Sequence, residues 1–379
     1  MKRVLFSAGE ASADIHAANL IKAIDGMSKE KIEFTGLGGD AMINTGLFTP
    51  EFYNRDFAVS GLFELAGHVT KIYSALRYFK RMTDLGSYDA AVLLDYPDFN
   101  MPLARHLKKR NIPVIYYISP QVWAWRSGRA LKLNKYADDI LTIFPFEKDF
   151  YAKLGVNVKY VGHPLLDEIR SYKSKVDIKK KNDEKIIAVL PGSRIAELDY
   201  ILPIMEKTCA IIKKGLKGKV RFLIPIAPTL KKNDIETRLS EEGKGLFEIT
   251  DYRSYEIYPV ADHVLLASGT ATVETALFEV PMTIVYKVSM LSAFLFKYFV
   301  RYDRPIGMVN LLLGKKVFTE FFQNDAVPEK IAEDVMKSLN DPKRHAELKN
   351  ELGKIKGMLS TGESPSKVAA KAVLERWGN

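Results

Sequence analysis

Short apolar runs alternate with longer amphipathic segments along nearly the whole chain. Each run has the length of a buried strand, and the segments between them show helical spacing of apolar residues, as in residues 102–110, 197–214 and 272–278. Strands alternating with helices in this way predict βαβ units and a parallel sheet that helices cover on both faces. The predicted strands are residues 4–7, 32–36, 90–94, 114–118, 140–143 and 158–161, then 186–190, 220–224, 247–249, 263–267 and 282–285.

The length of the chain and one break in this pattern predict two domains. A chain of 379 residues is too long for one ordinary core. Residues 167–184 are rich in lysine and poor in apolar side chains, so we expect them to form a solvated linker. The predicted domains are two Rossmann-like halves, residues 1–166 and 185–360, followed by a last helix over residues 365–379.

Charge and cysteine content exclude several classes of protein. The net charge of +10 favours anionic partners, but no nucleic-acid-binding module is recognisable, so we expect no nucleic-acid partner. The single cysteine, Cys209, cannot form an internal disulfide, and no zinc-binding pattern occurs. No secretion signal precedes the first strand, and lysines interrupt the apolar run 280–300, so we expect a cytoplasmic protein without a membrane span.

Two loops in the second half have the features of anion-binding helix starts. Gly192, Ser193 and Arg194 follow a strand and precede a helix, and Arg194 offers a fork of donors that suits phosphate oxygens. The sequence Ser268-Gly269-Thr270 leaves a helix N-terminus bare, and Glu274 lies one turn deeper, where it can accept ribose hydroxyls. Each loop can also be a plain capped turn, with Ser193 as the N-cap. Together the loops predict a nucleotide diphosphate site, and the absence of a D-x-D pair predicts that it needs no metal and no cofactor.

Polar residues also crowd two loops of the first half. Glu10, Ser12 and Asp14 follow the first strand and can hold acceptor hydroxyls or a phosphate, although Ser12 can equally be an N-cap and Asp14 a partner of the helix dipole. Asp95, Asp98 and Asn100 crowd the end of another strand, where structure alone gains little from them, and we expect Asn100 to contact the acceptor sugar. Group transfer to a hydroxyl needs a base, and one of these two carboxylates is well placed for it, although Asp98 can instead cap the next helix.

Two further segments allow a structural and a functional interpretation. Trp125 and Arg126 lie beyond a predicted buried strand and can contact a sugar or an acyl chain, but paired tryptophans are also common in packing. A helical stretch carries an apolar face edged by basic residues, which is typical of an interfacial membrane helix and also of a helix packed on a core. This face consists of Leu62, Leu65, Val69, Ile72, Leu76 and Phe79.

Several motifs, in order over nearly the whole chain, resemble those of the lipid-A-disaccharide synthase family. They are GEASAD at 9–14, DYPDFN at 95–100, SPQVWAWR at 119–126, FPFEKDFY at 144–151, GHPL at 162–165, LPGSR at 190–194 and SGTATVE at 268–274. The resemblance implies a GT-B fold, with two Rossmann-like domains whose parallel sheets face a cleft. It also implies inverting, metal-independent transfer of 2,3-diacylglucosamine from its UDP derivative to 2,3-diacylglucosamine 1-phosphate (lipid X), which gives the β-1,6-linked disaccharide 1-phosphate and UDP.

The resemblance also implies partners and residue roles. The family associates peripherally with the anionic inner face of the cytoplasmic membrane, which favours membrane contact by the 62–79 face, and its members can form homodimers that exchange C-terminal segments. Helix 365–379 then packs back on the first half or on a partner subunit. Asp98 is the favoured base, with Asp95 as the alternative. The residues implied to line UDP are Gly192, Ser193, Arg194, Ser268, Gly269, Thr270, Glu274 and Asn310.

One departure from the family and two other functions stay open. The family's first motif usually has glycine where this chain has Ala13, which puts acceptor roles for Glu10 and Asp14 in doubt. A UDP-sugar 2-epimerase shares the two-domain frame and the UDP site. A non-catalytic protein that binds nucleotide sugars or lipids is the alternative outside enzymes.

Overall fold

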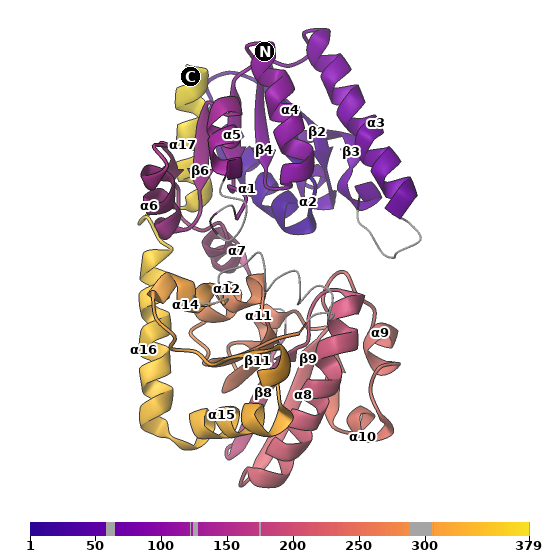
Figure 1. The fold of residues 1–379 in the computed structure, drawn as a ribbon, viewed down its shortest axis with the longest axis vertical. Coiled ribbons are helices and arrows are strands. Elements are labelled where there is room, and N and C mark those ends of the chain that lie inside the picture. Colours follow the sequence, from indigo (N-terminus) through magenta and orange to yellow (C-terminus); the bar gives the residue numbers. More distant parts are fainter. Residues whose placement is uncertain are drawn as a thin grey trace. The chain divides into compact units, whose positions relative to one another are not determined.

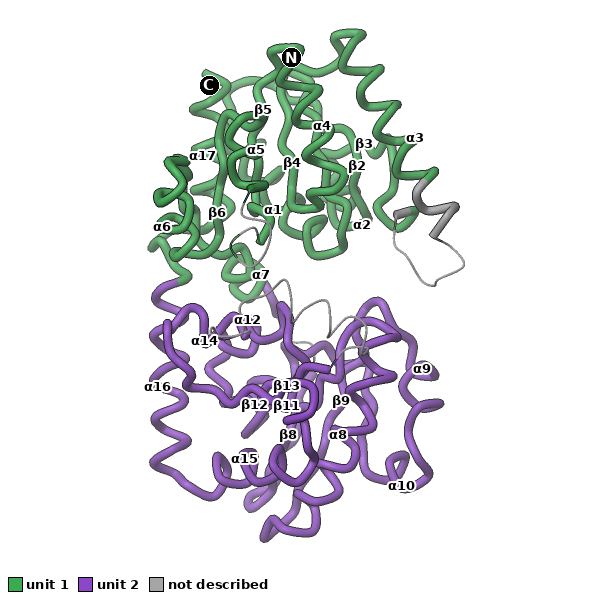
Figure 2. The backbone as a smooth tube through the Cα atoms, in the orientation of Figure 1, with its two compact units in different colours: residues 1–170, 359–379 green, residues 171–358 purple. Residues whose placement is uncertain are grey.

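The chain divides into two compact units, each of which is described by itself. The computed structural model describes residues 1–57, 65–121, 123, 128–173, 176–287, 305 and 307–378, with the backbone alone for residues 57 and 65–69. Unit 1 comprises residues 1–170 and 359–379, and unit 2 comprises residues 171–358 (Figure 2). The last segment of the chain therefore belongs to the first unit.

The described part of unit 1 contains a parallel seven-stranded sheet in the order β3-β2-β1-β4-β5-β6-β7 (Figure 1). Its strands are β1 (Lys2–Ala8), β2 (Ile32–Gly38), β3 (Phe48–Tyr53), β4 (Ala90–Leu94), β5 (Val114–Tyr117), β6 (Asp139–Thr142) and β7 (Lys159–Tyr160). The helices are α1 (Ala11–Met27), α2 (Asp40–Ile43), α3 (Leu65–Asp84), α4 (Pro97–Lys109), α5 (Gly128–Tyr136), α6 (Pro145–Lys153), α7 (Leu165–Ser171) and α17 (Pro365–Trp377), with a 3-10 turn at Asn54–Phe57. The central strands are buried on both faces, as the unbroken apolar runs predict.

Helices cover both faces of this sheet. Leu5 and Leu93 point to one face, where they pack with Phe79 of α3 and Phe99 of α4. The residues between them along each strand point to the opposite face. On that side α1 packs against α17, whose Val373 is fully buried. The C-terminal helix is therefore part of the core of unit 1.

The described part of unit 2 repeats this topology with a parallel six-stranded sheet in the order β10-β9-β8-β11-β12-β13. Its strands are β8 (Glu184–Leu190), β9 (Lys219–Pro225), β10 (Phe247–Thr250), β11 (His263–Ala267), β12 (Met282–Tyr286) and β13 (Glu320–Phe322). The helices are α8 (Ile195–Gly215), α9 (Lys232–Glu236), α10 (Glu241–Lys244), α11 (Ser254–Ile257), α12 (Thr270–Leu277), α14 (Met308–Leu313), α15 (Pro328–Asn340) and α16 (Pro342–Met358), with a 3-10 turn at Gln323–Asp325. Helices α8 and α15 pack together over one face, and α12, α14 and α16 form a second group. Two parallel α/β units confirm the predicted fold class.

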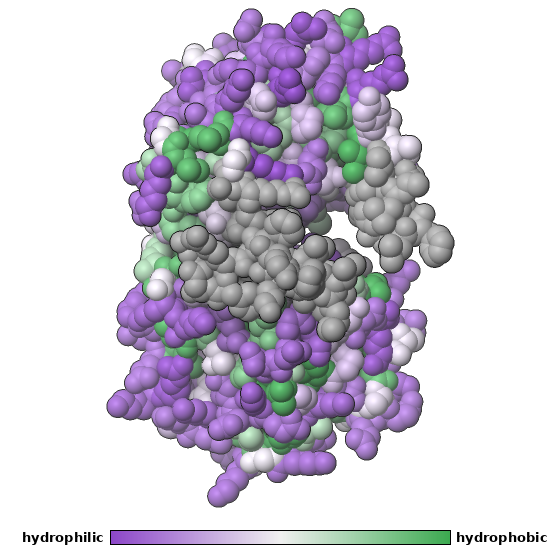
Figure 3. Space-filling view, in the orientation of Figure 1, coloured by the Kyte–Doolittle hydropathy of each residue, from purple (hydrophilic) through white to green (hydrophobic). Residues whose placement is uncertain are grey.

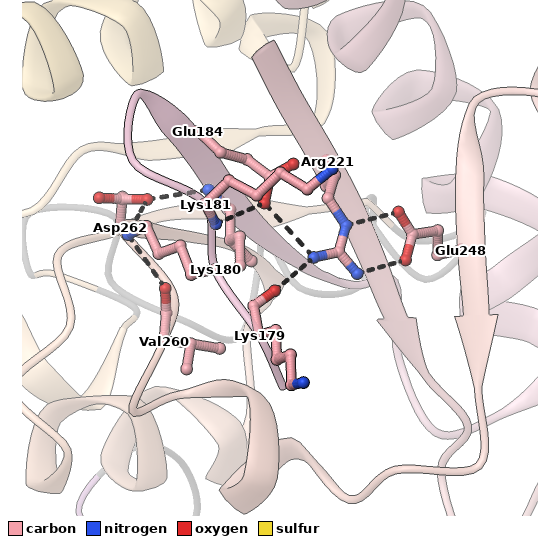
Figure 4. Close-up of polar contacts among 9 residues, drawn as sticks. Lys179, Lys180, Lys181, Glu184, Arg221, Glu248, Val260 and Asp262 are labelled. Carbon is pink, nitrogen blue, oxygen red and sulfur yellow. Dashed lines mark hydrogen bonds and ion pairs between the residues drawn. The ribbon is translucent and has the colours of Figure 1, made fainter. Parts of the chain in front are cut away.

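Both ends of the predicted linker belong to folded elements. Residues 167–171 lie in α7, and residues 179–184 form hydrogen bonds and ion pairs near the starts of β9 and β11 in unit 2 (Figure 4). Lys180 Nζ lies 2.7 Å from Asp262 Oδ2, and the backbone carbonyl of Lys179 accepts a hydrogen bond from Arg221. Arg221 also makes two 2.7 Å contacts with the carboxylate of Glu248. Ion pairs and backbone bonds therefore fix the end of this segment.

The described surface gives little sign of a membrane span. No helix among the described residues is long and apolar enough to cross a bilayer. The face seen in Figure 3 is mostly hydrophilic, and its hydrophobic residues lie in small, scattered groups.

Candidate active site

The predicted motifs lie at one special place in each sheet. In an open parallel sheet, ligands bind beyond the carboxyl ends of the strands, where the strand order reverses direction. In unit 1 this place lies between β1 and β4, where Ala8 pairs with Leu94. In unit 2 it lies between β8 and β11, where Leu190 pairs with Leu266. The loops that follow these four strands carry residues 9–14, 95–100, 191–194 and 268–270, so in each unit the motifs gather at this switch point.

A hydrogen-bonded scaffold holds the loop after β4 in unit 1. Asn100 is fully buried and donates from Nδ2 to the carbonyls of Leu94 and Asp95, both at 2.9 Å. Its Oδ1 accepts from Ser7 Oγ at 2.6 Å, which ties the loop to β1. Asn100 was predicted to contact the acceptor sugar, but these bonds make it a support of the loop instead.

The backbone of this loop is strained at the candidate base. Asp95 and Tyr96 have φ values of 44° and 42°, a left-handed conformation that costs a residue with a side chain about 1 kcal/mol or more. The Tyr116 hydroxyl donates to the Asp95 carbonyl at 2.5 Å and helps to hold this conformation. The neighbouring loop fits closely against it, because a Cβ at Gly9 would lie 2.4 Å from the Tyr96 ring. Strain retained by surrounding bonds is common at functional sites.

Of the two candidate bases, Asp95 has a pKa that suits a general base. Burial and the nearby charge of Glu10 raise the pKa of Asp95 to about 7. Smaller opposing effects come from the Tyr96 N–H, which donates to the carboxylate, and from the charge of His16. A general base works best when its pKa lies near the operating pH.

Asp98 has a different environment. Its side chain is 80% exposed and forms an ion pair with Arg129 of α5, with 2.7 Å between Oδ1 and Nη2. It occupies the first turn of α4, where the helix dipole stabilises a negative charge. The geometry therefore favours Asp95 over Asp98, the reverse of the order expected from the sequence.

Some side chains of residues 10–14 are exposed to solvent and others are buried. Glu10 and Ser12 are exposed, and the N-cap of α1 is Glu10 rather than Ser12. Asp14 is buried, and its two carboxylate oxygens accept hydrogen bonds from the backbone N–H groups of Gly39, Ala41 and Met42. Both oxygens of Asp14 thus hold the start of α2, which gives this residue a structural role in unit 1.

In unit 2 the first predicted anion loop leads into α8. Gly192 has φ of +128°, which favours glycine, and Ser193 and Arg194 are exposed. The N-cap of α8 is Arg194, not Ser193, and its extended backbone turns the chain into the helix. A residue that sequence reasoning missed, Glu197, accepts a hydrogen bond from Ser193 N–H at 2.7 Å. A signal for it was present, since a glutamate three residues after an N-cap often bonds back to the start of its helix.

The second anion loop leads into α12. Ser268 is half-buried, whereas Gly269 and Thr270 are exposed, and Gly269 is the N-cap. The first N–H groups of a helix have no partner within it, so they are available to an anion. Glu274 is half-buried one turn further along α12, and its charge contributes to raising the pKa of Tyr258. This arrangement suits a diphosphate at the helix start with hydroxyls deeper in the site.

The side chain of Asn310 is held by hydrogen bonds within unit 2. It is fully buried, and Nδ2 donates to the Phe318 carbonyl and to Glu320 Oε1, both at 2.7 Å. Its Oδ1 accepts from the N–H groups of Val317 and Phe318. All hydrogen-bonding groups of the amide are thus used within unit 2, so this side chain supports the turn after α14.

The remaining predicted residues are described only in part. Trp125, Arg126 and Leu62 lie outside the described residues, as do the side chains of Leu65 and Val69. Phe79 is fully buried in the core of unit 1, so the prediction that it contacts a membrane is wrong. Ile72 and Leu76 are half-buried and pack against the same core. This part of α3 therefore turns its apolar face inward.

A second buried carboxylate supports the loop that leads to Trp125. Glu147 of α6 accepts hydrogen bonds from Ser119 Oγ at 3.0 Å and from the N–H groups of Ile143 and Phe144. Burial raises the pKa of Glu147 to about 7. Sequence reasoning missed this residue because nothing in a glutamate of an amphipathic helix shows that it is buried.

Comparisons with known proteins agree with the fold and with the motifs. A sequence model of the lipid-A-disaccharide synthetase family matches residues 4–373. The lipid-A-disaccharide synthase of Syntrophus aciditrophicus is 37% identical over 98% of this chain and 97% of its own length. The solved structure of the calicheamicin glycosyltransferase CalG4 has a TM-score of 0.64 at 12% identity and covers 100% of this chain and 99% of its own. The UDP-GlcNAc 2-epimerase of Neisseria meningitidis has a TM-score of 0.62 at 10% identity, with 99% of each chain covered.

The two kinds of similarity carry different weight. At 10–12% identity the solved structures show only the shared GT-B fold, and the epimerase alternative rests on nothing closer than this. The sequence matches extend over nearly the full length of the chain at much higher identity. This protein therefore belongs to the lipid-A-disaccharide synthetase family and is a glycosyltransferase.

Proposed function

We propose that this chain transfers 2,3-diacylglucosamine from UDP-2,3-diacylglucosamine to lipid X and releases UDP. In this mechanism Asp95 takes the proton of the acceptor's 6-hydroxyl, and that oxygen attacks the anomeric carbon from the side opposite UDP. The bond between this carbon and the UDP oxygen breaks, and its electron pair leaves with the diphosphate. The observation that carries the proposal is the position of Asp95 at the switch point of unit 1, where two successive left-handed residues hold the loop and where burial raises the pKa of Asp95 to about 7.

The switch point of unit 2 supplies the groups that stabilise departing UDP. The N–H of Ser193, just before α8, and the first N–H groups of α12 can donate to phosphate oxygens, and Arg194, with its side chain 75% exposed, can reach them. Glu274 accepts the ribose hydroxyls in this proposal. Negative charge that develops on the diphosphate is then balanced by the chain's own dipoles and guanidinium group.

The test compares two aspartates that lie three residues apart. Radiolabelled UDP-2,3-diacylglucosamine is incubated with and without lipid X, using the wild type, Asp95→Asn and the matched control Asp98→Asn. We expect UDP release only with lipid X, and a loss of about 10²–10⁴-fold in kcat for Asp95→Asn with UDP binding retained. A larger loss for Asp98→Asn would reject Asp95 as the base, and UDP release without acceptor would reject the transfer itself.

The exposed side of α3 supports a peripheral contact with the cytoplasmic membrane face. Lys71, Tyr73, Arg77, Tyr78 and Arg81 are all exposed, with Tyr73 at 67%. Basic residues attract anionic lipid headgroups, and tyrosine is favoured at the interface. This face differs from the predicted apolar face, since Leu76 and Phe79 pack inward.

Sedimentation with anionic vesicles tests this contact. Replacement of Lys71, Arg77 and Arg81 with glutamine should weaken vesicle binding, and the same change at Lys213, Lys214 and Lys217 of unit 2 removes equal charge as a control. Equal weakening by both triple variants would mean that net charge, not α3, attracts the protein to the membrane.

We also propose that two copies can exchange α17. The helix packs on α1 of its own chain, and Arg376 and Lys2 tie its end to unit 1. An exchanged dimer would form the same contacts with the partner subunit. Light scattering of the purified protein distinguishes a dimer from a monomer, and a concentration-independent monomer would exclude the exchange.

A further inference from the structure

The first turn of α8 already holds a carboxylate at its anion-binding end. Glu197 Oε2 accepts a hydrogen bond from Ser193 N–H at 2.7 Å, and Oε1 lies 3.4 Å from Arg194 Nη1. The side chain folds back over Gly192, where a Cβ would lie 2.3 Å from Oε2 and 2.5 Å from the Glu197 Cβ. Glycine at position 192 is therefore needed both for its positive φ and to leave room for Glu197.

The groups that Glu197 uses are those that the diphosphate needs. A backbone N–H makes one good hydrogen bond, and a guanidinium paired with a carboxylate is partly neutralised. Ser193 N–H and Arg194 were assigned above to the phosphates of UDP. A phosphate oxygen and the Glu197 carboxylate cannot both accept a hydrogen bond from Ser193 N–H. Two negative groups held within hydrogen-bonding distance of one N–H would repel each other strongly.

We propose that Glu197 occupies the diphosphate position in the ligand-free chain and moves aside when the nucleotide binds; this rests on the proposed function of the same loop. The side chain can leave because it is 29% exposed, and both groups that it bonds lie within its own turn. Release therefore leaves the core of unit 2 unchanged. The carboxylate acts as a competitor that a ligand must displace.

This competition sets a threshold that any phosphate ligand must exceed. Every ligand at the α8 position displaces the same carboxylate, so each loses the same affinity. A diphosphate with its nucleoside gains contacts at α12 as well as at α8, so it can offset the loss of the Glu197 bonds. A single phosphate gains few contacts elsewhere, so its affinity falls to a level at which it rarely occupies the site. Glu197 thus keeps weakly bound phosphates out of the site without binding the nucleotide.

The test measures binding to the full-length protein by calorimetry, with UDP, UMP and inorganic phosphate as ligands. Glu197→Gln keeps an oxygen for Ser193 N–H but removes the charge. We expect it to bind UDP about 5- to 10-fold more tightly, and UMP and phosphate to gain at least as much. The matched control is Asp341→Asn, which removes a carboxylate that accepts from Lys343 and Arg344 N–H at the start of another helix of unit 2, α16. The control should not change UDP affinity.

Each other result has a definite meaning. Unchanged or weaker UDP binding by Glu197→Gln, with Arg194→Ala weakening it, would overturn the proposal and leave Glu197 as a helix cap only. Melting of the variant by circular dichroism checks that the fold is intact. Failure of the wild type to bind UDP would instead reject the proposed function of the loop, and with it this inference.

Discussion

Replacing Asp95 with asparagine should stabilise unit 1 at pH 8 while it abolishes transfer. The carboxylate has a pKa of about 7 in the folded chain against an ordinary value of 3.8, so folding disfavours its ionised form. The folded state therefore binds more protons than the unfolded state between these two values, and stability falls as pH rises from about 4 to 7. A shift of about 3 units corresponds to about 4 kcal/mol. Water reaching the half-buried carboxylate screens part of this, so we expect about 2 kcal/mol.

The assay can follow unit 1 alone. All three tryptophans of the chain, Trp123, Trp125 and Trp377, belong to unit 1, so their fluorescence in urea reports its unfolding. The free energy of unfolding of Asp95→Asn should exceed that of the wild type at pH 8. The difference should shrink towards pH 4, where the Asp95 carboxyl of the wild type is neutral in the folded state and about half neutral in the unfolded state. Asparagine keeps an oxygen for the Tyr96 N–H, so the loop is preserved. A variant that is less stable than the wild type at pH 8 would refute the reasoning.

Three other predictions follow from the same contacts. Transfer by the wild type should fall below about pH 7 as Asp95 takes up a proton, and Glu10→Gln should move this limit to lower pH, because it removes a charge that raises the Asp95 pKa; an unmoved pH–rate profile would contradict the coupling. Asp14→Ala leaves three backbone N–H groups without their acceptor and should destabilise unit 1 by about 3 kcal/mol, measured by tryptophan fluorescence in urea. Asn310→Ala should destabilise unit 2 by a similar amount in calorimetry, and its activity at low temperature should recover if its role is structural.

The sequence predicted the fold better than the directions of its side chains. The central strands could be placed because both of their faces are buried, which gives unbroken apolar runs. The edge strands β3 and β13 were missed, since β3 contains Pro50 and β13 has only three residues. An edge strand carries less apolar sequence and leaves a weaker pattern.

The motifs of the candidate site follow neighbouring strands, as the sequence predicts, but the contacts of individual side chains could not be predicted. Asp14 accepts from backbone groups 25 or more residues away, and Asn310 accepts from the turn that follows its own helix. The type of residue does not show which groups such a side chain will bond. In the sequence, Asp95 and Asp98 are two aspartates of one motif, and nothing in it distinguishes their environments. They differ in the structure because two successive left-handed residues, Asp95 and Tyr96, turn the first carboxylate inward and leave the second in solvent. No propensity scale predicts that conformation for aspartate and tyrosine.

The return of α17 to unit 1 has a consequence for synthesis on the ribosome. Unit 1 lacks its final helix until the chain is almost complete, roughly 190 residues after residue 170 has been made. At about 5–20 residues per second this delay lasts roughly 10–40 seconds. During that time the face of α1 that later meets α17 has no partner from its own chain, whereas unit 2 is synthesised without interruption. The nascent chain therefore presents a hydrophobic surface for chaperones, and the unit that begins first is the one that finishes last.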